Sequence, residues 1–188
     1  KKVPMLNRHI RALSERLVQG EPLTRNMLSW AKQHVEWSLA EGDYTAHDGV
    51  LMLVIDVNGN AAMTVGEYEP LADTSAKALR ARSAEARSEA DETGVAPELL
   101  ASVNDGELAF VAPADECLCG TATLIEQLAQ TKGISVTRVD IPAQLKGALF
   151  LVSDEHGVVP AADADAAEAD AAMVTFFADG YEKLRARR

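Results

Sequence analysis

The stretch 117–136, CLCGTATLIEQLAQTKGISV, holds the residues of this chain best suited to chemistry. Cys117 and Cys119 are separated by one residue, and Gly120 and Thr121 follow directly. Such a stretch could form a metal clip, a redox pair, or an anion site at the start of a helix. A zinc site needs about four ligands, usually with wider cysteine spacing, and cysteines at i and i+2 do not reach disulfide geometry without distortion. We therefore expect no metal site, and we interpret both cysteines as small buried apolar side chains in a reducing compartment.

The residues after the cysteines predict a helix. Thr121 is a suitable N-cap, the side chains of Leu124, Ile125 and Leu128 form an apolar stripe, and Gly133 suits the position just beyond the helix. The first amide groups of a helix lack intrahelical partners and carry partial positive charge, which favours phosphate. Many helices begin in this way and bind nothing, so a plain capped helix remains the alternative interpretation.

The first part of the chain is predicted to form two helices followed by a β-hairpin. Helical spacing of apolar residues covers 4–39 and is interrupted by GEPLT, where Thr24 is a suitable N-cap. Trp30 and Trp37 lie seven residues apart on one helix face, so core packing is expected for both. The apolar run 50–57, the turn signal Asn58-Gly59 and the run 61–68 predict a β-hairpin.

The second part of the chain alternates helical and strand-like patterns. An Ala-, Arg- and Glu-rich helix or connector over 76–92 ends near Gly94 and Pro97. A second hairpin, 99–103 with 108–111, turns at the Asn104-Asp105-Gly106 sequence. Strands are expected over 134–141 and 148–153, and a helix over 161–178. The predicted fold class is α+β, with an N-terminal α+β domain over 1–72, a linker or helix over 73–97, and a strand-rich domain with helices over 98–188.

Composition limits the classes of function. The chain has 188 residues, 47% hydrophobic and 25% charged, with a formal net charge of -11. A net negative chain does not favour nucleic acid as a partner, because nucleic-acid binders concentrate Lys and Arg. No apolar run is long enough to cross a bilayer, and no signal peptide is recognisable. We therefore expect a cytoplasmic protein with no nucleic-acid or membrane partner.

The order of the motifs resembles fold-type IV pyridoxal-phosphate (PLP) enzymes, the family of branched-chain and D-amino-acid aminotransferases and aminodeoxychorismate lyases. The segments that carry this resemblance are NDGELAFVAP, LCGTAT, LIEQLAQTKGISV, SDEHGVVPA and, more weakly, PMLNRHIRALSERL. The resemblance covers most of the chain and implies a two-domain architecture of that family in a shortened form. It also implies a homodimer whose substrate is an amino acid or an amino-acid-like small molecule. The activity implied is that of a class IV aminotransferase, which is a transferase, or that of a lyase.

The resemblance further implies roles for particular residues. Lys77 would form the Schiff base with the PLP aldehyde. Gly120, Thr121 and Ala122 would hold the phosphate, and Arg11 and Glu98 would complete the cofactor site. His156 and Gly157 would lie on the substrate side of the cofactor. The alternative interpretation of His156 is a structural turn residue beside a glycine.

This chain departs from the family pattern at several of these positions. Cys119 stands where the family has proline, Ala122 and Thr123 stand where it has threonine and arginine, and Ala12 replaces an arginine of the first helix. The leading interpretation is a PLP-dependent enzyme. The alternative is a non-catalytic relative that has lost cofactor binding and acts as a binding or scaffold protein.

Overall fold

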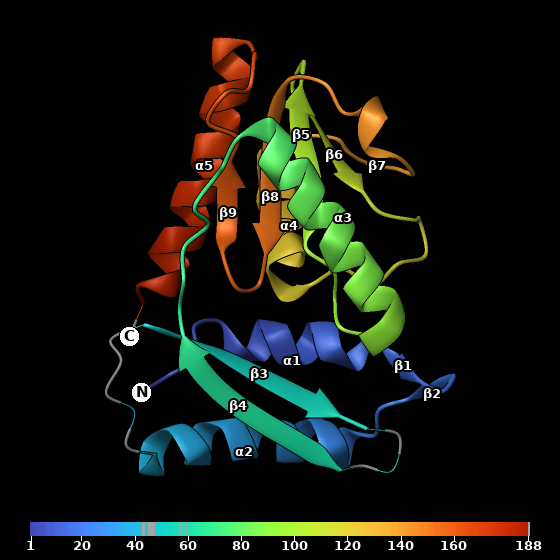
Figure 1. Cartoon of the computed structure of the whole chain (residues 1–188), viewed down its shortest axis with the longest axis vertical. Helices are drawn as coiled ribbons and strands as arrows, with labels where there is room; N and C mark the ends of the chain where they lie inside the picture. Colours follow the sequence, from blue (N-terminus) through green and yellow to red (C-terminus); the bar gives the residue numbers. More distant parts are fainter. Residues whose placement is uncertain (43, 45–47, 57, 59, 188) are drawn as a thin grey trace. The chain divides into compact units, whose positions relative to one another are not determined.

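The structure is a computed structural model that describes residues 1–42, 44, 48–56, 58 and 60–187. The chain divides into two compact units. The first comprises Lys1–Pro70 together with the last residues from Arg185, and the second comprises Leu71–Leu184 (Figure 1). The first boundary lies close to the predicted end of the N-terminal domain. Most of the predicted linker or helix over 73–97 is helical, over Ala76–Thr93, and these residues belong to the second unit.

The first unit begins with two helices, α1 (Leu6–Ser14) and α2 (Arg25–Glu41), joined by a short hairpin of β1 (Leu17–Val18) and β2 (Glu21–Pro22). Thr24 caps α2 as predicted, because its Oγ1 accepts a hydrogen bond of 3.2 Å from the Met27 amide. The two-residue strands were not expected from the sequence, which has no alternating pattern there.

The predicted hairpin of the first unit is confirmed in its strands. β3 (Gly49–Ile55) pairs antiparallel with β4 (Ala61–Glu67), with Met52 opposite Thr64. Asp56 Oδ1 accepts hydrogen bonds of 2.8 Å from the amides of Asn58 and Asn60 and so holds the turn. Gly59 of the predicted turn lies outside the described residues.

The two tryptophans of α2 correct one expectation. Trp30 is 43% exposed and Trp37 is 60% exposed, so neither is a core residue. The buried stripe of α2 consists of Ala31, Val35 and Leu39. Trp30 precedes the first of these by one residue, which turns its side chain about 100° around the helix from that stripe.

The second unit is built on a five-stranded sheet with the order β7-β6-β5-β8-β9. Its strands are β5 (Leu99–Asn104), β6 (Glu107–Val111), β7 (Val136–Val139), β8 (Ala148–Ser153) and β9 (Gly157–Pro160). Only β6 and β7 pair in parallel among these neighbours, and helix α4 (Gly120–Thr131) supplies the crossover that parallel pairing requires. A 3-10 turn over Pro142–Gln144 leads toward β8.

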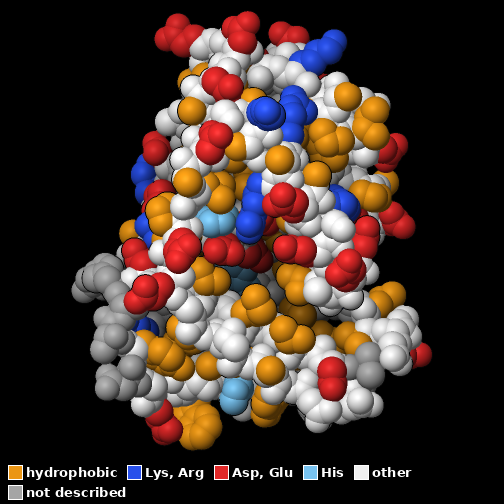
Figure 2. Space-filling view, in the orientation of Figure 1, with side chains coloured by type: hydrophobic (Ala, Val, Ile, Leu, Met, Phe, Trp, Pro, Cys, Tyr) orange, Lys and Arg blue, Asp and Glu red, His pale blue; other side chains and the backbone are white. Residues whose placement is uncertain are grey.

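Helices cover both faces of this sheet. Helix α4 and helix α5 (Glu168–Arg185) pack on the face that holds Phe110 and Phe150, through residues such as Ile125 and Phe177. Helix α3 (Ala76–Thr93) packs on the opposite face through Leu79. Figure 1 shows α3 in front of the strands and α4 behind them. Acidic side chains outnumber basic ones on the face of this unit that Figure 2 shows.

The turn between β5 and β6 is fixed by a buried carboxylate. Asp105 and Gly106 both have positive φ, 51° and 75°, as a tight hairpin turn requires. Asp170 of α5 is 5% exposed, and its two carboxylate oxygens accept hydrogen bonds of 3.1 Å from the amides of Asp105 and Gly106. The second predicted hairpin is therefore confirmed, and α5 is tied to its tip.

The boundaries of the last two long helices differ from those predicted. Helix α4 begins at Gly120, and Cys119 is its N-cap instead of Thr121: Cys119 is extended, and its Sγ accepts from the Ala122 amide at 3.5 Å. The last helix begins at Glu168 and not at residue 161. Residues before it continue from β9, where the Ala162 amide donates to the Thr74 carbonyl at 2.9 Å.

Candidate functional site

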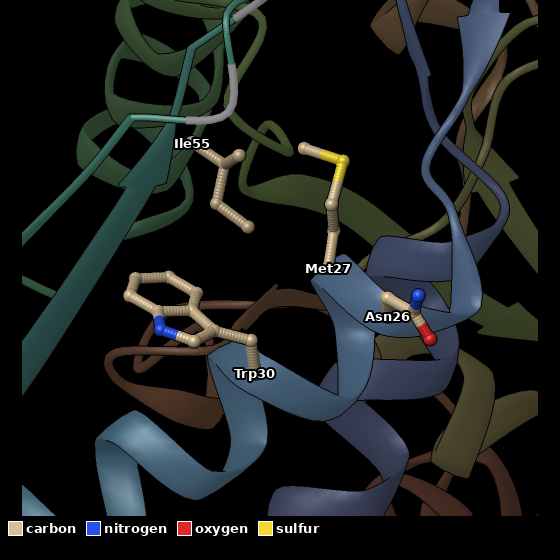
Figure 3. Close-up of a pocket in the computed structure, with 4 residues that line it drawn as sticks. All are labelled: Asn26, Met27, Trp30 and Ile55. Carbon is tan, nitrogen blue, oxygen red and sulfur yellow. The ribbon is translucent and has the colours of Figure 1, made fainter.

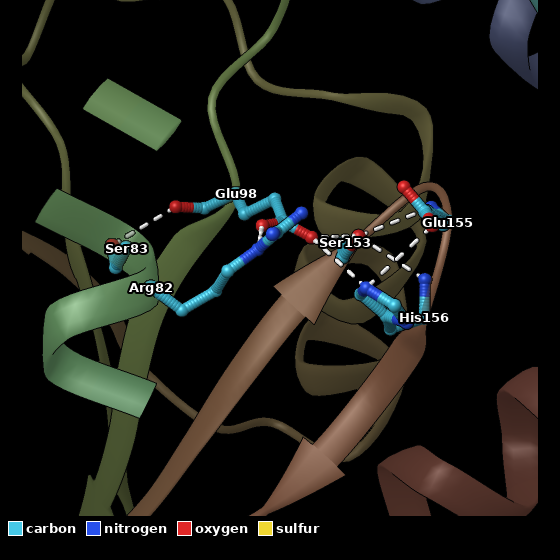
Figure 4. Close-up of polar contacts among 6 residues, drawn as sticks. All are labelled: Arg82, Ser83, Glu98, Ser153, Glu155 and His156. Carbon is cyan, nitrogen blue, oxygen red and sulfur yellow. Dashed lines mark hydrogen bonds and ion pairs between the residues drawn. The ribbon is translucent and has the colours of Figure 1, made fainter. Parts of the chain in front are cut away.

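Polar side chains gather where β5 begins and β8 ends. Antiparallel pairing of Leu99 with Val152 brings Glu98 beside Ser153, and the turn into β9 adds Glu155 and His156. Arg82 reaches the same place from α3. We call Arg82, Glu98, Ser153, Glu155 and His156 the polar cluster (Figure 4).

Glu98 is the centre of the polar cluster. One carboxylate oxygen forms an ion pair with Arg82 Nε, and the other accepts a 2.7 Å hydrogen bond from Ser153 Oγ. The Glu98 carbonyl accepts a further 2.9 Å bond from Ser83 Oγ. The hydrogen bond and charge of Glu98 raise the pKa of the Arg82 guanidinium above its ordinary value. These contacts hold α3 against the sheet.

The arrangement is not a nucleophilic triad. Ser153 Oγ donates its proton to Glu98 and accepts from the amides of Glu155 and His156 at 3.0 and 3.1 Å. His156 Nε2 lies 3.8 Å from carboxylate oxygens of both Glu98 and Glu155, beyond hydrogen-bond distance. In a triad the imidazole lies between the hydroxyl and the carboxylate; here the carboxylate lies between the hydroxyl and the imidazole. Ser153 therefore fixes the β8–β9 turn.

The start of α4 is capped by a distant carboxylate. Asp154 follows β8, and its carboxylate oxygens accept hydrogen bonds from the Gly120 amide at 3.2 Å and the Thr121 amide at 2.7 Å. Cys119 Sγ accepts a hydrogen bond from the Ala122 amide, so all three amides predicted to hold phosphate have partners within the chain. Thr121 Oγ1 is buried and meets no hydrogen-bond partner among the described residues.

The two cysteines differ in burial, and only Cys119 is the buried apolar side chain that was predicted for both. Cys119 is 3% exposed and belongs to the core beneath α4, while Cys117 is half-buried. Burial raises the pKa of the Cys119 thiol well above its ordinary value, and the negative charge of Asp154 raises it further. Among the described residues, no three or more His, Cys, Asp and Glu side chains are arranged to hold a metal ion.

Lys77 lies away from the start of α4. The amide of its neighbour Ala76 donates a 2.6 Å hydrogen bond to Asp163. Asp163 lies just after β9, where the Ala161 amide donates to the carbonyl of Leu149 near the start of β8. Asp154 is five residues further along the chain than Leu149, about 16 Å at the rise of a β-strand. Lys77 is exposed, and α3 covers the other face of the sheet from α4. The structure therefore does not bring Lys77 to the predicted phosphate amides.

The other predicted site residues divide between the two units. The second unit brings together Glu98, His156 and Gly157 with the start of α4 at one end of the sheet. The His156 side chain is 3% exposed. Gly157 has a structural reason to be glycine: its φ is +74°, and a Cβ there would lie 2.3 Å from the Tyr181 ring. Arg11 is an exposed residue of α1 in the first unit.

The first unit contains a shallow apolar pocket of about 280 Å³ lined by Asn26, Met27, Trp30 and Ile55 (Figure 3). The side chains of Met27 and Trp30 rise from α2 on the side of Ile55. The Trp30 ring also stacks on His34 with centroids 4.8 Å apart. The four lining residues include no titratable side chain, so the pocket suits a small apolar group and offers no acid or base.

Sequence reasoning missed Asp154, Ser153 and Arg82. The DEHG turn after a predicted strand marks Asp154 as a turn residue, but a cap that spans more than thirty residues leaves no local signal. Arg82 stands in a helix with many charged residues, and nothing in the sequence separates it from its exposed neighbours.

Comparison with solved structures supports the fold expected from the sequence. The chain superposes on an aminotransferase from Brucella abortus crystallised with PLP, with a TM-score of 0.54 and 13% identity over 95% of this chain and 84% of the other. It also matches a protein provisionally assigned as a 4-amino-4-deoxychorismate lyase, with a TM-score of 0.44 and 17% identity over 86% of each chain; this match is too loose to carry an argument. No protein-family model and no curated protein matches the sequence.

The predicted α+β fold of the fold-type IV kind is therefore confirmed at the level of the fold. None of the described helices has the length and apolar character that a membrane span requires.

The residues of this chain do not fit PLP as the resemblance implies. A phosphate at the start of α4 would have to take the amides that Asp154 holds, and it would lie beside that carboxylate. The aldehyde would then have to reach Lys77, which lies toward the other end of β8 with its helix on the other face of the sheet.

Proposed function

We propose that this chain is a non-catalytic relative of the fold-type IV PLP enzymes, which keeps their fold without a lysine-bound cofactor and acts as a binding or scaffold protein. The observation that carries this proposal is the separation of Lys77 from the start of α4. The phosphate and the aldehyde of PLP belong to one small molecule, and a sheet stands between the two groups that would have to hold them.

The capped start of α4 supports the same proposal. A helix start attracts an anion because its amides lack partners and carry partial positive charge. Here the Asp154 carboxylate supplies that anion from within the chain. A cofactor phosphate would have to displace the Asp154 carboxylate, which is covalently part of the chain, so its net binding free energy at this position would be small.

A binding role is supported by the surface of the first unit. Five large apolar side chains there are more than two-fifths exposed: Leu17, Trp30, Trp37, Met52 and Val54. Exposed apolar side chains mark a binding surface where they adjoin one another, as Trp30 adjoins Met27 and Ile55 around the apolar pocket. The homodimer that the resemblance implies and the cytoplasmic location expected from the cysteines both fit within this proposal.

The second candidate function is a PLP-dependent aminotransferase or lyase that acts on an amino acid or a related small molecule. The observation in its favour is the fold shared with an aminotransferase that binds PLP.

Reduction with borohydride separates the two candidates. Purified protein is incubated with PLP, reduced, digested and analysed by mass spectrometry, with Lys77→Ala as the matched control. The non-catalytic proposal predicts no saturable absorption band once free PLP is removed, and only slow labelling spread over surface lysines. A saturable band with one equivalent of label on Lys77, absent from Lys77→Ala, would establish the enzyme instead.

A further inference from the structure

The start of α4 has the parts of an oxyanion site whose ligand comes from the chain itself. Two carboxylate oxygens of Asp154 meet two consecutive amides, those of Gly120 and Thr121. The residues involved are more than thirty positions apart in the sequence, so the contact is a tertiary one. An ordinary N-cap comes from the residue that begins the helix, and that position is already filled by Cys119.

Thr121 supplies an observation independent of the helix start. Its side chain is fully buried, and its hydroxyl meets no hydrogen-bond partner among the described residues. Side chains in a helix lean toward its N-terminus, which is the end that Asp154 caps. A buried hydroxyl without a partner is costly. The two carboxylate oxygens bond the two amides and neither bonds this hydroxyl, whereas a tetrahedral oxyanion offers a third oxygen that points in another direction.

The exposure of Asp154 decides how this site would behave. Asp154 itself is exposed, while Gly120 and Thr121 are buried beneath it. Removing the carboxylate would therefore open the two amides to solvent instead of leaving a sealed void. Glu98 and Glu155 lie in the same region and weaken the attraction for any free anion.

From these contacts we infer that the start of α4 is an oxyanion site occupied by the Asp154 carboxylate, and that it binds a free tetrahedral oxyanion when this carboxylate is removed. This inference deepens the proposed function, on which it rests for the premise that no cofactor phosphate holds the site. It assigns Asp154 the role of a resident ligand that excludes phosphate compounds.

The test uses inorganic phosphate as the probe and the full chain labelled with ¹⁵N. In Asp154→Ala, we expect phosphate to shift the amide resonances of Gly120 and Thr121 in a saturable way. The affinity should exceed that of the wild type by about tenfold or more, the factor expected from one charged hydrogen-bond partner. Glu155→Ala is the matched control, because it removes the same charge from the same turn, while both cap contacts come from Asp154. It should gain little.

A second substitution tests the unused donor. Thr121→Val introduced into Asp154→Ala keeps the side-chain shape and removes the hydroxyl, and it should weaken phosphate binding by about threefold to tenfold. If Asp154→Ala does not fold, Asp154→Asn gives the same test with a smaller expected gain.

Three results would overturn the inference: a folded Asp154 variant whose Gly120 and Thr121 amides ignore phosphate, an equal gain in Glu155→Ala, or a wild type that already binds as tightly. None of these depends on Lys77. Borohydride labelling of Lys77 can therefore fail or succeed separately and reports on the proposed function alone.

Discussion

Replacing Asp154 with alanine should destabilise the second unit by an amount that the contacts at the start of α4 define. The substitution removes two hydrogen bonds, of 3.2 and 2.7 Å, between a carboxylate and helix amides. Loss of a good N-cap costs about 0.5–2 kcal/mol, and a negative charge at a helix start adds about 0.3–1 kcal/mol. Because Asp154 is exposed, water can replace part of what is lost. We therefore expect the free energy of unfolding to fall by about 1–2 kcal/mol.

Urea denaturation followed by circular dichroism measures this change, with the slope of the transition checked for constancy. The expected fall in Tm is about 2–8 °C for a chain of this size. Glu155→Ala should stay within about 0.5 kcal/mol of the wild type, because its partly exposed carboxylate lies 3.8 Å from His156, beyond hydrogen-bond distance. An Asp154→Ala protein as stable as the wild type, or a Glu155→Ala protein equally destabilised, would refute the role given to the Asp154 carboxylate.

Three further substitutions or titrations test other parts of the structure. Asp170→Ala should lower the free energy of unfolding by about 2–3 kcal/mol, because two turn amides lose a buried charged partner. The control Asp179→Ala, on the exposed face of α5, should change the free energy of unfolding by less than about 0.5 kcal/mol. Equal effects of the two substitutions in denaturation would contradict the turn contact. Burial and then the Asp154 charge raise the pKa of the Cys119 thiol. The contribution of the buried neutral thiol to the free energy of unfolding is therefore full below the unfolded pKa of about 8.5 and is lost as the pH rises toward the folded value. Thiol labelling at pH 8 should modify the half-buried Cys117 well before Cys119, and equal rates would argue against the buried thiol. Hydrogen bonds from Ser75 lower the pKa of the exposed Asp73. The stabilisation of the start of α3 by this carboxylate is therefore present above about pH 3.9 and is lost as the pH falls through the folded pKa. An NMR titration of the Asp73 carboxyl carbon that finds an ordinary or raised pKa would contradict this.

Local patterns predicted the elements of this fold well. The Thr24 cap and both hairpins follow from signals contained within a few residues, and the structure has them where they were expected. The Asn104-Asp105-Gly106 sequence specifies its turn because two positive φ values are needed there. These features depend on neighbours in the chain, so a single sequence is enough to find them.

Tertiary contacts account for what the sequence did not predict. The i, i+7 spacing of Trp30 and Trp37 places them on one face of α2, but it does not say which face is covered, and Ala31, Val35 and Leu39 proved to be the buried one. The Ala- and Arg-rich pattern over 76–92 predicted an exposed helix or a connector. The helix is present, but the few apolar residues of α3 pack it against the sheet, which the pattern did not predict.

The candidate site was predicted in part. The sequence located the start of α4 as an anion-attracting position, and the resemblance pointed to Glu98 and His156, which the fold brings to the same end of the sheet. The occupant of that position could not be predicted, because Asp154 reaches Gly120 and Thr121 only after β8 and α4 have packed. The distance of Lys77 from this place likewise depends on how strand order assigns α3 and α4 to opposite faces.

The most direct test of the account follows the amides of Gly120 and Thr121 in wild-type protein during a titration with PLP. Both resonances should stay in place at every concentration, because the Asp154 carboxylate holds these amides and excludes the phosphate. A saturable shift of both resonances, accompanied by a visible absorption band, would contradict it.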